Sequence, residues 1–114
     1  MTSDDTFELY DLEVTVEGDE KDFVCRHHAG HAFRVEGEDL VFPEGGRFSM
    51  YALAALIPLL PAKERPTSPN DWMTTDALIA CPDLNCGAKF RIRRTAKRIL
   101  SHAECTVVPL GEKA

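Results

Sequence analysis

The sequence lacks an apolar run long enough to cross a membrane. Its longest such run, YALAALIPLL at residues 51–60, is about half of the roughly 20 residues that a spanning helix needs. The acidic start, MTSDDTFELYD, also lacks the basic beginning and apolar centre of a signal peptide. We therefore expect a cytoplasmic protein without membrane contact, in a compartment where thiols stay reduced.

Several signatures of catalysis are missing as well. The chain has no glycine-rich phosphate loop, no Gly-x-Ser-x-Gly elbow and no His-Glu-x-x-His helix. It also has no excess of positive charge, because its formal net charge is −6, which disfavours a general nucleic-acid or anionic-membrane surface. What remains to be explained is a set of four cysteines and four histidines.

Length and composition favour one folded domain. With 114 residues and 44% apolar content, the chain can bury one modest core but not two. We expect a single domain over residues 1–114, with flexible tails at 1–6 and 107–114.

Alternating polar and apolar residues predict several short strands. The clearest is FELYDLEVTVE at 7–17, and another is AKFRIR at 88–93, where inward Phe90 and Ile92 alternate with basic residues. Shorter strands are expected in the other apolar stretches, at residues 23–27, 32–37, 40–42 and 76–80.

One helix is well marked, and it begins after Ser49, a good N-cap. The segment MYALAALI that follows is apolar on nearly every face, so we expect it to be central and buried until Pro58 and Pro61 end or kink it. A second helix is expected at 95–105. Together the elements predict an α+β fold: a small, mostly antiparallel sheet packed on one central apolar helix.

A proline-rich loop is expected at residues 61–75. Loops of about 15 residues are uncommon in compact domains and often serve as lids or binding loops. Trp72 in this loop has two interpretations: it plugs the core beneath the loop, or it lines a pocket.

The strongest chemical signal is CPDLNCG at residues 81–87. A turn of this length brings two thiolates around one metal ion. Pro82 stiffens the turn, and Gly87 lets the backbone bend away after the second cysteine. We interpret Cys81 and Cys86 as half of a metal site, similar to the Cys-Pro…Cys-Gly knuckle of zinc ribbons, rather than as two small buried residues on a hairpin.

Two other segments offer the remaining ligands. CRHHAGH at 25–31 places Cys25 and His27 on one side of an extended strand, or pairs Cys25 with His28 in a tighter turn. HAEC at 102–105 places its histidine and cysteine on one helical face. We favour the first segment. The predicted metal ligands are Cys25, His27, Cys81 and Cys86, and the alternative ligands are His28, His31, His102 and Cys105.

The order of these motifs over residues 9–94 resembles an uncharacterised family of short bacterial proteins. The shared pattern is a Cys-x-x-Gly-His-like segment, Gly-Asp-x-Phe, a Pro-x-Gly turn, an alanine-rich helix and a late Cys-Pro-Asp. The resemblance implies that Cys25 and His27 match the family's first cysteine and its histidine, and that Cys81 matches its late cysteine.

Further positions both follow and depart from that family. Gly30 and Phe33 match its glycine and phenylalanine. His31 stands where the family usually has aspartate, and Ser49 stands where many members carry another cysteine. Cys86 would then replace the missing thiol. The family has no known function to carry over, so the resemblance supports the site and leaves its purpose open.

The predicted ligands suit zinc, with iron as the alternative. With four protein ligands the site is closed, and we expect a small zinc-binding accessory or binding module whose fold the metal clamps. With three ligands and a water, the chain is instead a small metalloenzyme with Lewis-acid, hydrolytic or lyase-type chemistry on an anionic substrate, and His28 or His31 is the acid–base group. Whether it is an enzyme stays open. The expected partners are another protein, a small anionic ligand or a second copy of the chain.

A basic stripe follows the late cysteines and has two interpretations. It is a solvated face that balances the acidic residues 1–22, which we favour, or it contacts an anion or a nucleic acid. No exposed aromatic residues interleave with it, so nucleic-acid binding is not expected. The stripe consists of Lys89, Arg91, Arg93, Arg94, Lys97 and Arg98.

Overall fold

The main feature of the computed structural model, which describes residues 5–111, is a five-stranded antiparallel sheet with the order β3-β2-β1-β5-β4. The strands are β1 (Thr6–Glu17), β2 (Gly30–Glu36), β3 (Asp39–Val41), β4 (Leu78–Ala80) and β5 (Lys89–Ser101). The helical segments are η1 (Glu20–Asp22), α1 (Met50–Leu56), α2 (Leu60–Glu64), α3 (Trp72–Thr75) and α4 (His102–Cys105). The predicted α+β class is confirmed.

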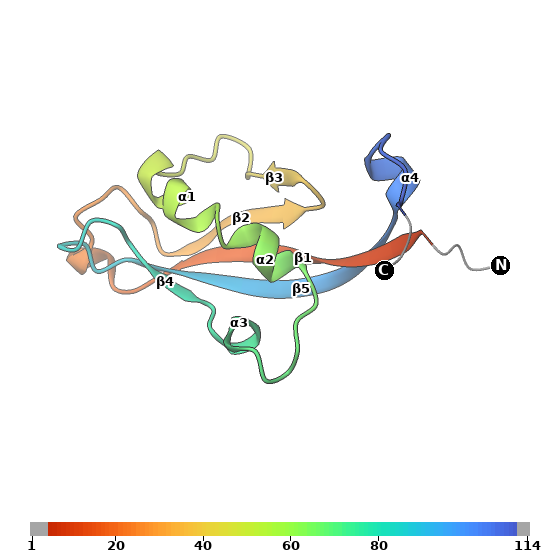
Figure 1. Cartoon of the computed structure of the whole chain (residues 1–114). Helices are drawn as coiled ribbons and strands as arrows, with labels where there is room; N and C mark the ends of the chain where they lie inside the picture. The colour runs from red at the N-terminus through yellow and green to blue at the C-terminus, as the bar shows by residue number, and fades with distance from the viewer. Residues whose placement is uncertain (1–4, 112–114) are drawn as a thin grey trace.

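Strands β1 and β5 run the length of the molecule (Figure 1). They pair from Thr6 with Ser101 at one end to Glu17 with Lys89 at the other. Strands β2 and β4 flank only the half that contains Glu17 and Lys89. The other half of β1 and β5 is therefore a two-stranded ribbon that extends beyond the rest of the sheet.

That ribbon corrects the prediction of a helix at 95–105. Residues 95–101 belong to β5, and only the last four residues form the short helix α4. No residue of β5 after Ile92 is buried, so the sequence shows no alternation that would mark a strand. Pairing with β1 overrides the local helical preference, as tertiary context commonly does.

The core lies between one face of the sheet and helices α1 and α2 (Figure 1). Phe90 and Ile92 point inward, as predicted, with exposed fractions of 0% and 2%. The other buried strand residues lie two positions apart along β1 and β2, except between Leu9 and Leu12, where a β-bulge between Asp11 and Leu12 adds one residue. They are Leu9, Leu12, Val14, Val16, Phe33 and Val35.

Helix α1 starts where predicted but is less buried than expected. The Ser49 side chain accepts a hydrogen bond from the backbone N–H of Ala52 at 3.3 Å, which caps the first turn. Only Ala52 and Leu56 are buried, whereas Met50 and Tyr51 are 70% and 72% exposed. Seven residues give two turns, so one narrow face reaches the sheet and the rest of this apolar helix faces outward.

The predicted loop at 61–75 contains most of α2 and all of α3. Trp72 is 65% exposed, so its interpretation as a core plug is wrong. Neighbouring Met73 is only partly exposed, and its carbonyl accepts a hydrogen bond from the buried Lys63 ammonium. Through this bond α2 holds α3 in place.

No helix among residues 5–111 is long and apolar enough to span a membrane.

Parts of the two predicted tails contact the rest of the fold. Thr6 is the first residue of β1 and pairs with Ser101 of β5, and the carbonyl of Asp5 accepts a hydrogen bond from the His102 N–H at 2.8 Å. After α4, the carbonyl of Val108 lies 2.7 Å from His102 Nε2. Residues 1–4 and 112–114 lie outside the described residues.

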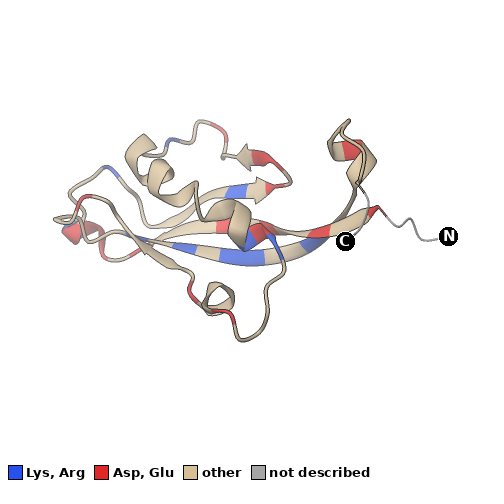
Figure 2. Ribbon diagram, in the orientation of Figure 1, with Lys and Arg blue, Asp and Glu red and all other residues tan. Residues whose placement is uncertain are grey.

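Cross-strand ion pairs account for most of the basic stripe. Figure 2 shows basic residues along β5 beside acidic residues of β1. Such pairs on a wet face contribute little stability each, but they balance the charge of the two strands locally. The pairs are Arg91 with Glu17, Arg93 with Glu13, Lys97 with Glu8, and Arg98 with Asp11. The structure agrees with the interpretation as a solvated face.

Candidate metal centre

Two loops meet at one end of the sheet and carry the predicted ligands. One joins β1 to β2 and contains Cys25 and His27, and the other joins β4 to β5 and contains Cys81 and Cys86. Because the end of β1 pairs with the start of β5, both loops emerge side by side. The first loop is not the strand predicted at 23–27; it is irregular after η1.

The second loop is the expected knuckle. The Cys86 N–H donates to the carbonyl of Asp83 at 2.9 Å, which closes a turn, and the Asp83 carboxylate accepts a hydrogen bond from the Asn85 N–H at 3.0 Å. The Cys81 N–H bonds the carbonyl of Ala88 at 3.2 Å, so the loop stays closed as a hairpin end.

Gly87 fastens the knuckle to the first loop. Its N–H donates to the carbonyl of Asp22 at 2.9 Å. A Cβ at this position would lie only 2.9 Å from the Asp22 Cβ, so a side chain does not fit. This close backbone approach brings the two pairs of ligands together.

The four predicted residues converge in space. One ligand atom from each of Cys25, His27, Cys81 and Cys86 lies within 4.8 Å of the others. The Cys25 and Cys81 sulfurs are 3.8 Å apart, and His27 Nε2 is 3.8 Å from the Cys81 sulfur. Two sulfurs on a tetrahedral zinc ion, each about 2.3 Å from it, are separated by about 3.8 Å. The cluster can therefore hold one metal ion.

Burial sets the protonation state of His27. Its ring is 7% exposed and packs against Phe90 at 5.0 Å, Phe48 at 5.9 Å and Phe23 at 6.4 Å between ring centroids. Burial among these rings lowers the pKa of His27, which favours the neutral imidazole. The neutral form is the one that binds a metal.

The thiols differ in their electrostatic surroundings. Burial, followed by hydrogen bonds with Cys81 and Cys86, raises the pKa of the Cys25 thiol to about 12. Burial also acts to raise the pKa of Cys86, but hydrogen bonds from the backbone N–H groups of Cys25, Ala88 and Val24 outweigh it and lower that pKa to about 7. The protein thus already stabilises one thiolate in the cluster, and a bound cation would stabilise the others.

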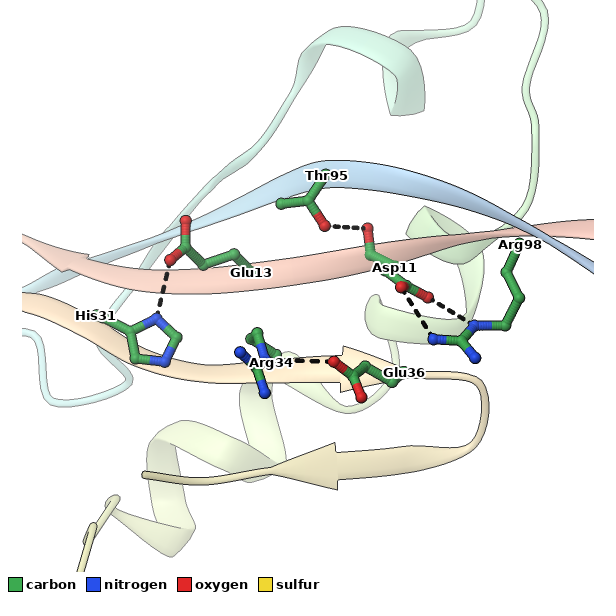
Figure 3. A network of polar contacts seen from close by, with 7 residues as sticks. All are labelled: Asp11, Glu13, His31, Arg34, Glu36, Thr95 and Arg98. Atoms are coloured by element: carbon green, nitrogen blue, oxygen red, sulfur yellow. Dashed lines mark hydrogen bonds and ion pairs between the residues drawn. The ribbon is translucent and has the colours of Figure 1, made fainter. Parts of the chain in front are cut away.

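The four alternative ligands lie outside the cluster. The His28 side chain is 90% exposed and lies 3.0 Å from a Glu20 oxygen. His31 contacts Glu13 at 2.9 Å across the sheet (Figure 3). His102 and Cys105 belong to α4, at the far end of the ribbon (Figure 1). The sequence left these alternatives open because spacing alone does not say which distant segments meet.

A cavity of about 430 Å³ adjoins the cluster. Cys25 and Cys81 line it together with Ser49, Tyr51 and Asp83. An Asp83 oxygen lies 3.8 Å from the Cys25 sulfur. Asp83 was not among the predicted site residues, although its place inside the turn between Cys81 and Cys86 is the sequence signal that it lies near the thiols.

A second cavity, which the sequence did not predict, lies at the other end of the sheet. It is lined in part by Glu64, which is buried and has one oxygen without a hydrogen-bond partner among residues 5–111. No sequence motif marks it, because its residues come from five separate segments.

The chain matches no family model, no curated protein and no solved structure, so the predicted family resemblance stays a prediction.

Proposed function

We propose that this chain is a small zinc-binding domain in which the metal clamps two loops together and the folded domain serves as a binding or accessory module. The observation that carries the proposal is the convergence of Cys25, His27, Cys81 and Cys86 within 4.8 Å. Three thiolates and one imidazole form a ligand set typical of structural zinc, and iron is the alternative ion.

A closed site is favoured over a catalytic one. Four protein ligands fill the tetrahedral positions of zinc, whereas a catalytic zinc keeps one position for water or substrate. The module interpretation draws support from the exposed apolar side chains on and near the two loops. Val24 is 63% exposed and Leu84 is 91% exposed. Such residues suit contact with another protein or a second copy of the chain.

Metal analysis tests the proposal directly. The purified chain should contain about one zinc per molecule, and Cys81→Ser should lose most of it and unfold at lower temperature, since metal binding is coupled to folding. Cys105→Ser, which changes a thiol outside the cluster, is the matched control. A metal-free protein with unchanged melting temperature would overturn the proposal.

X-ray absorption distinguishes the closed site from the metalloenzyme alternative. A closed site should show three sulfurs at about 2.3 Å and one nitrogen at about 2.0–2.1 Å from zinc. A water oxygen in place of one sulfur would favour the enzyme instead.

A further inference from the structure

A cavity of about 460 Å³ lies at the ribbon end of the sheet, away from the metal centre. Its floor is formed by Phe7 and Leu9 of β1 and by Leu100 of β5. The turn between β2 and β3 forms one wall and α4 forms another. Its volume is within the range of small-molecule sites.

The cavity is acidic around an apolar floor. Five carboxylates and two guanidinium groups line it. The carboxylates are Glu36, Glu38, Asp39, Glu64 and Glu104, and the cations are Arg65 and Arg98.

Internal pairs neutralise only part of this charge. Arg98 Nε and Nη2 each donate to an Asp11 oxygen at 3.0 Å, and Glu36 pairs with Arg34 at 3.4 Å (Figure 3). The other three carboxylates of the walls form no ion pair with any residue between 5 and 111. They are Glu38, Asp39 and Glu104.

Glu64 gives the cavity an unsatisfied acceptor. Its side chain is 8% exposed, and its Oε2 atom has no hydrogen-bond partner among the described residues. Its nearest cation is Arg65, with 4.0 Å between Glu64 Oε1 and the guanidinium nitrogen, which is too long for a hydrogen bond. Buried carboxylates are normally paired, and Oε2 itself is shielded from solvent, so a ligand donor would approach Oε1, which also has no hydrogen bond within residues 5–111.

The spacing of the acids indicates an extended cation rather than a metal ion. Within residues 5–111, the only group of histidine, cysteine and carboxylate atoms close enough to share one ion is the Cys/His cluster at the other end of the sheet. The cavity carboxylates therefore do not converge on one point, as calcium or magnesium would require. Separate ammonium groups joined by methylenes fit both the scattered acids and the apolar floor.

We propose that this cavity binds a small aliphatic diamine or polyamine. Glu64 and the acidic turn between β2 and β3 accept hydrogen bonds from its ammonium groups, while Phe7, Leu9 and Leu100 contact its methylenes.

Calorimetric titration of the zinc-loaded full chain with spermidine tests this proposal. We expect saturable binding at one site, weakened about tenfold in Glu64→Gln, since a buried charge-assisted hydrogen bond is lost. Glu104→Gln, on the exposed helix α4, should weaken binding by a smaller factor. It is the second test variant and replaces Glu64→Gln if that protein folds poorly. Glu44→Gln makes the same charge change outside the cavity and should leave binding unchanged.

Three outcomes would overturn the proposal. They are no saturable binding, equal weakening by Glu44→Gln, and tighter binding of tetralysine or magnesium than of spermidine at equal ionic strength. Zinc content is measured in the same samples, so failure here leaves the proposed metal centre untouched.

Discussion

The sulfurs of Cys25 and Cys81 lie 3.8 Å apart, although 56 positions separate the two residues in the chain. The sheet makes this contact, because β1 and β5 are paired at the end where both loops emerge. The two loops are then held by the hydrogen bond from Gly87 to Asp22. A metal at this point would join the beginning of the chain to its last third.

The choice between the two predicted ligand sets can be tested by paired substitutions. Cys25→Ala should reduce zinc content sharply, because it removes one of the four converging donors. The double variant His102→Ala/Cys105→Ala should keep about one zinc per chain, since α4 lies at the far end of the ribbon. Elemental analysis of both proteins decides, and the reverse pattern would contradict the site described above.

Gly87→Ala should destabilise the knuckle. The new Cβ would lie 2.9 Å from the Asp22 Cβ and 3.2 Å from the Asp22 carbonyl oxygen, so the two loops must separate. We expect a loss of about 1–3 kcal/mol in unfolding free energy, as for other overpacked sites. Chemical denaturation measures it. Gly111→Ala is the control, because no described residue other than its chain neighbour places an atom within 4 Å of its Cβ position, and an equal effect there would refute the steric argument.

Arg94→Lys should loosen the segment after α2. The Arg94 guanidinium donates to the carbonyls of Lys63 and Arg65, both at 2.8 Å, and lies 4.6 Å from the centroid of the Tyr10 ring. Lysine keeps the charge but cannot reproduce this planar fork. We expect a loss of about 1–2 kcal/mol in unfolding free energy.

The comparison for that substitution is Arg93→Lys, at an exposed position with one ion pair to Glu13 at 3.6 Å. It should have little effect on thermal unfolding. If both variants behave alike, the contacts of Arg94 do not anchor the segment.

Glu64→Gln should raise the melting temperature at neutral pH. Burial raises the pKa of Glu64, against the opposing influence of Arg65, so the folded state holds the proton more tightly than the unfolded state. The stability that Glu64 contributes is present below its ordinary pKa and is lost as pH rises through the higher folded pKa. The variant's advantage over wild type should therefore shrink as pH falls toward the ordinary glutamate range. An advantage independent of pH would contradict this account.

The basic stripe should not support specific nucleic-acid binding. Arg91, Arg93, Lys97 and Arg98 have carboxylate partners on β1, and Arg94 is engaged with backbone carbonyls. We expect affinity for DNA or RNA no tighter than the roughly 10⁻⁴–10⁻⁶ M of non-specific contacts at physiological salt. Fluorescence anisotropy would measure it, and nanomolar binding would show the expectation to be wrong.

Local sequence determined the elements whose signals lie within a few residues. The turn-forming residues between Cys81 and Cys86 predict the knuckle, the alternation at 7–17 predicts β1, and Ser49 predicts the start of α1. In each case the deciding interaction joins near neighbours, or the burial of one face repeats every second residue.

Tertiary structure decided the features that need contacts between segments far apart in the sequence: the end of β5, the choice of metal ligands and the acidic cavity. Residues 95–101 became a strand only because β1 offered backbone partners, and exposure on both faces left no pattern to reveal it. The same pairing placed Cys25 and His27, rather than His102 and Cys105, beside the knuckle. The acidic cavity around Glu64 was likewise assembled from separate segments. Spacing along a chain limits which neighbours can meet locally, whereas contacts across tens of residues depend on the free energy of the whole packed sheet.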